Sequence, residues 1–197
     1  MWDVKNEHEE SIAQTAAQLV VQEGLEYRDA KRQALKRLGL SPRTPLPSNA
    51  LVEEAVKEYI AIFCGDEQVE ELTHLRELAL KWMVRLRDFR PHLSGSVWRG
   101  TASAQSDIYL QLFCEDPKSA EIELINLGLR YQVTRIRGFK GEDVDALSLN
   151  IQSSVLARYV GLHLMIYDLD DIRGALKVDP QMGPLRGNEQ AVMKLLE

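Results

Sequence analysis

The residues that decide the fold lie in the middle of the chain and read Leu93-Ser94-Gly95-Ser96-Val97-Trp98-Arg99-Gly100-Thr101, then Ser106-Asp107-Ile108-Tyr109-Leu110-Gln111-Leu112-Phe113. A Gly-Ser pair closes a short apolar run, and ten residues later a single Asp opens a stretch of alternating side chains. Alternation with a period of two is typical of a β-strand. We therefore predict a turn at Gly95 and a strand that begins near Asp107.

The composition of this turn suits an anion. Glycine lets the backbone at Gly95 approach a phosphate closely, because it has no Cβ. Ser96 and the amides after it offer donors at a helix start, where the helix dipole favours negative charge. Arg99 and Thr101 add donors within the same seven residues. The turn thus predicts an anion site, although an ordinary strand-to-helix turn, with Asp107 bonded to a local amide, is the simpler alternative.

The first 90 residues predict helices, because apolar residues recur three and four positions apart and glycines stand where these stripes end. The segment from Ser41 to Ser48 contains three prolines, which remove backbone donors and fix φ. We expect a linker at about residues 41–48. The N-terminal part therefore forms a helical region over residues 1–90.

From residue 91 the pattern changes to the shorter period of strands. Strands are predicted over residues 107–113, 130–136, 145–151 and 156–167, with a turn at 152–154. Asp116 and Pro117 are an N-cap and a first-turn proline, so a helix begins there. This order predicts an α+β fold in which residues 91–197 form a small mixed β-sheet with flanking helices.

Composition and charge exclude several classes of protein. The net charge is −6, shared about equally by the two halves, so there is no strong signal for nucleic-acid binding. The longest apolar runs are too short to cross a membrane, and the acidic N-terminus lacks the apolar core of a signal peptide. Cys64 and Cys114 lie far apart and are expected as free thiols. We expect a cytoplasmic protein.

The motif around Gly95 resembles the signature of the DNA polymerase beta-like nucleotidyltransferase superfamily. That signature has an apolar residue, Gly, and Gly or Ser, then nine to thirteen residues, then Asp, an apolar residue and a second acid. Gly95, Ser96, Asp107 and Ile108 fit this pattern, whereas Tyr109 stands where the second carboxylate belongs. The helical region over residues 1–90 and the short motifs Gly100-Thr101-Ala102 and Ser106-Asp107-Ile108 also resemble a group of small proteobacterial proteins.

The resemblance implies a nucleotidyltransferase-like sheet and transfer of a nucleoside monophosphate from a nucleoside triphosphate with Mg²⁺. It implies that Ser96 holds phosphates and that Asp107 is the metal ligand and a catalytic residue. Its third carboxylate belongs on a neighbouring strand, where we interpret Asp145 as the candidate beside Ser148 and Asn150, with Asp168 a weaker one. A phenol at Tyr109 is a poor bridging ligand for two divalent ions.

Two functions therefore remain open at this stage. The first is an active nucleotidyltransferase, and the second is a catalytically degenerate module that binds a nucleotide or another anion. A related alternative is that such a module binds a protein partner through its helical region. A glycine-bounded loop is flanked by three basic residues, Arg135, Arg137 and Lys140. Two interpretations of these residues are open: they bind a phosphate, or they form the solvated end of a hairpin. His163 lies on an apolar strand, where a hydrogen-bonded core histidine is the simplest interpretation.

Overall fold

The computed structural model describes the backbone of residues 2–197 and the side chains of residues 7–197. Its internal contacts divide the chain into two units, residues 1–70 with 100–105, and residues 71–99 with 106–197. The division falls inside one long helix, whereas the sequence predicts a boundary at residue 90. Whether that boundary separates two independently folding domains stays a prediction.

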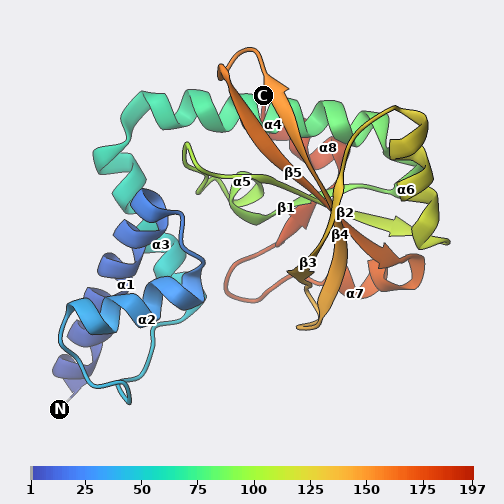
Figure 1. Cartoon of the computed structure of the whole chain (residues 1–197). Coiled ribbons are helices and arrows are strands. Elements are labelled where there is room, and N and C mark those ends of the chain that lie inside the picture. Colours follow the sequence, from blue (N-terminus) through green and yellow to red (C-terminus); the bar gives the residue numbers. More distant parts are fainter. Residues whose placement is uncertain (1) are drawn as a thin grey trace. The chain divides into compact units, whose positions relative to one another are not determined.

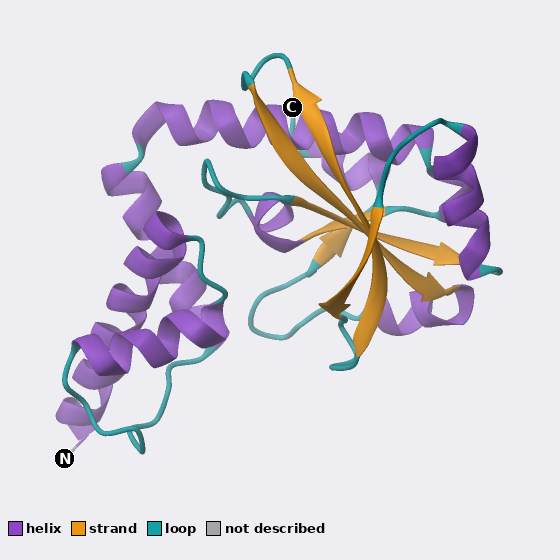
Figure 2. Cartoon of the chain, in the orientation of Figure 1, coloured by secondary structure: helices purple, strands orange, loops and turns teal. Residues whose placement is uncertain are grey.

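The first unit is helical, as Figures 1 and 2 show. Its elements are α1 (Trp2–Glu23), α2 (Tyr27–Arg37), α3 (Asn49–Phe63) and the start of α4 (Gly65–Arg85). Alanine and aliphatic side chains of α1 to α3 form one buried cluster, which includes Ile12, Leu19 and Val56. Residues 41–48 between α2 and α3 are not helical, as the prolines predict.

The second unit is built on a mixed six-stranded sheet with flanking helices, which agrees with the predicted α+β class (Figure 2). The strand order is β3-β4-β5-β2-β1-β6, and only β2 and β5 run parallel. The strands are β1 (His92–Ser94), β2 (Ile108–Cys114), β3 (Gln132–Arg137), β4 (Asp143–Ser153), β5 (Arg158–Asp168) and β6 (Arg186–Gly187). The helices are α5 (Gly95–Arg99), α6 (Pro117–Asn126), α7 (Ile172–Ala175) and α8 (Glu189–Lys194), with 3₁₀ turns at Arg87–Phe89 and Leu169–Asp171.

The sheet has two different faces. One face carries Ile108, Leu110 and Leu112 of β2 with Leu162 and Leu164 of β5, and all of these side chains are buried. The opposite face is buried at one end only, where a cluster forms from Phe113, Ala146, Met165, Tyr167 and Ala175. At its other end the same face carries polar side chains. This polar end holds the candidate site.

Two local predictions require correction. The turn between β4 and β5 lies at residues 154–157 and not at 152–154, because pairing continues to Ser153 and Arg158. The sequence also does not predict β6, which pairs with β1 through Leu93–Gly187 and Ser94–Arg186. A strand of two residues has no alternation to detect. The free thiols of Cys64 and Cys114 are confirmed.

Candidate functional site

The predicted turn at Gly95 is present and lies against the strand that follows. β1 and β2 are antiparallel, and their register pairs Ser94 with Tyr109. Gly95 has a φ of +75°, and a Cβ built there would lie 3.4 Å from the Tyr109 ring. Glycine is favoured here by the left-handed backbone, since the distance to the ring is an ordinary van der Waals contact. The turn places Gly95 beside Tyr109, the position at which the resemblance predicts a second carboxylate.

Asp107 directly precedes β2, and its carboxylate is held by two donors from β5. Its Oδ1 accepts a hydrogen bond from the Gly161 amide at 3.0 Å, and its Oδ2 lies 3.2 Å from His163 Nε2. A Cβ on Gly161 would lie 2.5 Å from the Asp107 carboxyl carbon, so only glycine leaves room for this side chain. The hydrogen bond from His163 lowers the pKa of Asp107, the Gly161 amide lowers it further, and burial opposes both.

His163 continues a chain of hydrogen bonds across the sheet. Its Nδ1 lies 2.8 Å from Ser148 Oγ, and Ser148 Oγ lies 2.7 Å from Thr134 Oγ1. The register explains this contact, because Ser148 pairs with His163 and His163 pairs with Tyr109 on adjacent strands. The Tyr109 ring stacks on the imidazole, with ring centroids 4.8 Å apart. We call Asp107, His163, Ser148 and Thr134 the relay.

Asp145 does not join this site, which corrects the interpretation from sequence. It pairs with Arg135 on β3, 3.3 Å from its guanidinium, and its side chain is 60% exposed. Ala146, the next residue, lies opposite Met165, so Asp145 lies level with Ile166 and faces away from the relay. At about 3.3 Å per residue this is roughly 10–17 Å along β5 from the residues that hold Asp107. The interpretation grouped Asp145 with Ser148, but side chains three residues apart point to opposite faces.

Asp168 and the three basic residues near the loop also lie outside the relay. Asp168 pairs with Cys114 at the far end of β2. Arg135, Arg137 and Lys140 form ion pairs with Asp145, Asp143 and Asp171 respectively. This arrangement supports the solvated hairpin end rather than a phosphate site.

The four predicted anion ligands are divided between the two units. Gly95, Ser96 and Arg99 lie in α5, and the side chains of Ser96 and Arg99 are half-buried. Thr101 belongs to the other unit, where it is buried. Their joint role in anion binding stays a prediction.

The structure adds one cation that sequence reasoning missed. Arg186 of β6 is buried, donates a hydrogen bond to the Ala175 carbonyl and lies 4.9 Å above the Phe139 ring. Among the side chains of residues 7–197, none is an acidic partner for it. Within the described part of the chain, its Nε and the Oε1 of buried Gln111 have no hydrogen-bond partner. Burial lowers the pKa of Arg186, and a buried charge without a counter-charge is costly.

The residues present do not fit a pair of magnesium ions. Mg²⁺ prefers hard oxygen ligands, and a two-metal site needs carboxylates that bridge the ions. Beside Asp107 the chain offers a phenol at Tyr109 and an imidazole at His163, and both Asp107 oxygens already accept hydrogen bonds. Within residues 7–197 no group of three or more His, Cys, Asp or Glu side chains is arranged to hold a metal.

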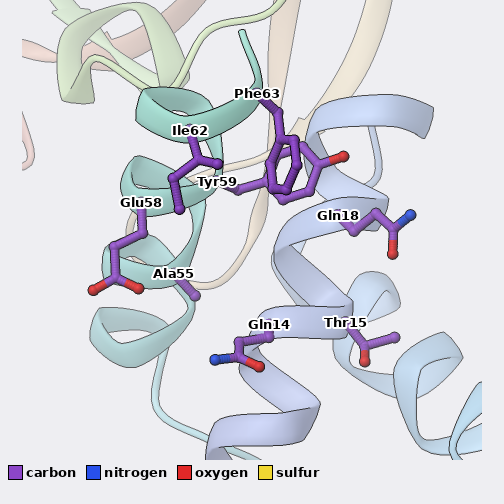
Figure 3. Close-up of a pocket in the computed structure, with 8 residues that line it drawn as sticks. All are labelled: Gln14, Thr15, Gln18, Ala55, Glu58, Tyr59, Ile62 and Phe63. Carbon is purple, nitrogen blue, oxygen red and sulfur yellow. The ribbon is translucent and has the colours of Figure 1, made fainter.

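A pocket of about 350 Å³ lies in the helical unit between α1 and α3, and Figure 3 shows its lining. The rings of Tyr59 and Phe63 meet there in a tilted contact with 4.6 Å between their centroids, and Phe63 is 68% exposed. Among the described residues that line this pocket, Glu58 carries the one carboxylate. None of the helices among residues 2–197 has the length and apolar character that a membrane span requires.

Comparison with known proteins gives few likenesses. No protein-family model matches the sequence, and no curated protein is significantly similar to it. The structure is similar to Cid1 in complex with the UTP analogue UMPNPP, at 16% identity and a TM-score of 0.35 over 60% of this chain and 39% of that chain. Cid1 with its short product ApU gives 14% identity and a TM-score of 0.36 over 60% and 39%.

A third likeness is to the Cid1 poly(U) polymerase with MgGTP bound, at 15% identity and a TM-score of 0.35 over 56% and 38% of the two chains. This chain thus spans about two fifths of the length of those proteins.

Proposed function

We propose that this protein is a nucleotidyltransferase-like module that binds a nucleoside triphosphate or another phosphate-bearing anion without metal-dependent catalysis. The observation that carries the proposal is the state of Asp107. Both of its carboxylate oxygens accept hydrogen bonds from β5, and Tyr109 and His163 occupy the neighbouring positions on β2 and β5. The loss of carboxylates from a two-metal site removes the bridging ligands that phosphoryl chemistry needs.

Two features support an anionic ligand. The turn keeps the left-handed glycine at Gly95, followed by Ser96 and Arg99, which are the groups that a phosphate would contact. The register also pairs Ser94 with Arg186, and the buried Arg186 guanidinium, which contacts the Ala175 carbonyl and the Phe139 ring, has no acidic partner among the described side chains. An anion would offset the cost of this buried charge.

A binding titration tests the proposal. We expect the protein to bind inorganic triphosphate or a nucleoside triphosphate equally in EDTA and in Mg²⁺, measured by isothermal titration calorimetry. Ser96→Ala combined with Arg99→Ala should weaken binding at least about tenfold, because charge-assisted hydrogen bonds are lost. The control carries Ser154→Ala and Arg173→Ala, the same residue types at exposed positions away from the turn. Binding that requires Mg²⁺ and disappears in Asp107→Asn would instead favour the active enzyme.

A gain-of-function series tests the interpretation of the metal site. Tyr109→Asp alone should not create Mg²⁺ binding, because His163 still occupies the neighbouring position on β5. Tyr109→Asp with His163→Asp supplies three carboxylates around one point, so this variant should show a Mg²⁺-dependent increase in melting temperature. A similar increase in the unchanged protein contradicts the proposed degeneracy.

A further inference from the structure

We infer that Ser148, His163 and Asp107 form a nucleophilic triad that cleaves a carboxylic ester through an acyl-serine intermediate. This activity goes beyond anion binding and does not depend on it. Two successive hydrogen bonds join the nucleophile, the base and the orienting carboxylate. The Ser148 Oγ lies 2.8 Å from His163 Nδ1, and His163 Nε2 lies 3.2 Å from Asp107 Oδ2. A base within hydrogen-bond reach of a hydroxyl, itself oriented by a third group, is the arrangement that activates serine nucleophiles.

The direction of each hydrogen bond follows from the chemistry of the groups. An ionised carboxylate only accepts hydrogen bonds, so His163 Nε2 must carry the proton that faces Asp107. In a neutral imidazole, Nδ1 is then an acceptor, and Ser148 Oγ must be the donor across 2.8 Å. The Ser148 proton is therefore aimed at the base that would remove it.

The structure also fixes the base in place. The Gly161 amide holds the other Asp107 oxygen, and the absence of a Cβ at Gly161 makes room for the carboxylate. The Tyr109 ring lies over one face of the imidazole. His163 is thus restrained at both nitrogens and on one face, while its side chain keeps 19% exposure. Such restraint of the base lowers the cost of reaching the reactive geometry.

The nucleophile lies at the accessible end of the sheet face. Ser148 and Thr134 are only partly buried, in contrast to Ala146 and Met165 on the same face. Thr134 Oγ1 lies 2.7 Å from Ser148 Oγ and 3.4 Å from the Ala146 carbonyl oxygen. Because the Ser148 proton is directed to His163, Thr134 is the donor in its contact with Ser148 and helps to fix the Ser148 hydroxyl.

The reaction balances with water as the only co-reactant. Ser148 Oγ forms a bond to the ester carbonyl carbon, and its proton moves to His163 Nδ1. The tetrahedral intermediate collapses with cleavage of the bond to the alkoxide, which takes the proton from His163 and leaves as an alcohol. Water then attacks the acyl-serine carbonyl by the same route, and the carboxylic acid and free Ser148 are restored.

A fluorophosphonate probe tests the nucleophile directly, because serine attack on its phosphorus expels fluoride and leaves a stable adduct. We expect one adduct by intact-protein mass spectrometry, located at Ser148 by peptide mapping and absent in Ser148→Ala. Ser154→Ala, in the exposed turn of the same hairpin, is the matched control and should label normally. His163→Gln should slow labelling by about 10²–10⁴-fold, the usual contribution of a general base. The rate of p-nitrophenyl acetate hydrolysis should follow the same order as labelling: normal in Ser154→Ala, slower in His163→Gln and lost in Ser148→Ala.

Asp107 is a positioning residue, so its test uses a spectroscopic signature. In Asp107→Asn, the ¹⁵N shifts of the His163 ring should show loss of the single Nε2–H tautomer, with slower labelling and an unchanged fold by circular dichroism. Equal labelling in His163→Gln, or no adduct at Ser148 in the folded protein, overturns the inference. Because the proposed anion site uses Ser96 and Arg99, triphosphate binding that persists while labelling fails would reject the triad alone.

Discussion

At the scale of single residues, Gly161 shows how one missing methyl group makes the relay possible. The Asp107 carboxylate occupies the space that a Cβ would take, at 2.5 Å. We predict that Gly161→Ala displaces Asp107 from His163 and lowers the free energy of unfolding by about 1–3 kcal/mol, as overpacking usually does. Urea denaturation measures this loss.

Gly174→Ala provides the matched control, because a Cβ there meets only the Phe139 ring at an ordinary 3.9 Å. In the helical backbone of α7 this change should be neutral or stabilising by up to about 1 kcal/mol. A Gly161→Ala variant as stable as the unchanged protein would show that Asp107 is not confined in this way.

His92 makes stability depend on pH. It is buried, its Nδ1 lies 2.9 Å from the Arg90 carbonyl, and its ring meets Phe113 edge-on. Burial lowers the pKa of His92, nearby Arg186 lowers it further, and the bond to Arg90 opposes both. His92 in the unfolded chain therefore binds a proton at higher pH than His92 in the folded protein. The contribution of His92 to the free energy of unfolding is thus complete above the ordinary histidine pKa of about 6.5 and is lost as pH falls below it.

We predict that the unfolding free energy of the unchanged protein falls between pH 7.5 and 5 and falls less in His92→Gln. The readout is the slope against pH, so a general destabilisation of the variant does not affect it. Val97→Ala, which truncates a fully buried side chain that carries no ionisable group, serves as the control and should keep the slope of the unchanged protein. Equal slopes in His92→Gln and the unchanged protein would contradict the prediction.

At the scale of elements, α6 begins where the sequence indicates and for the expected reason. Asp116 Oδ1 accepts a hydrogen bond from the Lys118 amide at 3.0 Å, and Pro117 occupies the first turn. We predict that Asp116→Ala lowers the free energy of unfolding by about 0.5–2 kcal/mol, because a first-turn amide loses its acceptor. Thermal and urea denaturation should agree on this loss.

The control for the cap is Glu115→Ala, an exposed acidic neighbour that makes the same change in charge. Asp116→Asn should recover most of the stability, since asparagine caps about as well as aspartate. If Asp116→Ala and Glu115→Ala cost the same, the effect is one of charge and not of capping.

At the scale of the whole molecule, the two units predict where the chain can be cut. Residues 71–85 of α4 belong to the unit that contains the sheet, and Arg76 donates to the carbonyls of Val97 and Trp98. A fragment of residues 91–197 lacks five buried side chains of α4: Leu72, Leu75, Ala79, Trp82 and Met83. Each large apolar side chain contributes about 1.5–3 kcal/mol on burial, against a total stability of about 5–15 kcal/mol for a domain.

We therefore expect residues 71–197 to unfold cooperatively in urea and residues 91–197 to give no cooperative transition. Dispersion of amide signals in NMR spectra of the two fragments is the second measurement. A folded 91–197 fragment would support the boundary that the sequence predicts at residue 90.

The sequence by itself determined the local structure of this protein. Asp116 with Pro117 marks a helix start, alternation after Asp107 marks a strand, and Gly95 marks the turn before it, because these signals act within a few residues. The α+β class follows from their order. The resemblance at Gly95 and Asp107 also indicated the part of the chain that carries the candidate site.

Only the tertiary structure decided which side chains meet. Asp107 contacts His163, 56 positions away, because β2 and β5 run parallel in one particular register, and Ser148 joins them from the antiparallel β4. The sequence favoured Asp145 for this place and treated His163 as a core residue. A register is fixed by packing across the whole sheet, and a shift of one residue reverses the face on which a side chain lies, so local pattern alone does not select Ser148 over Asp145.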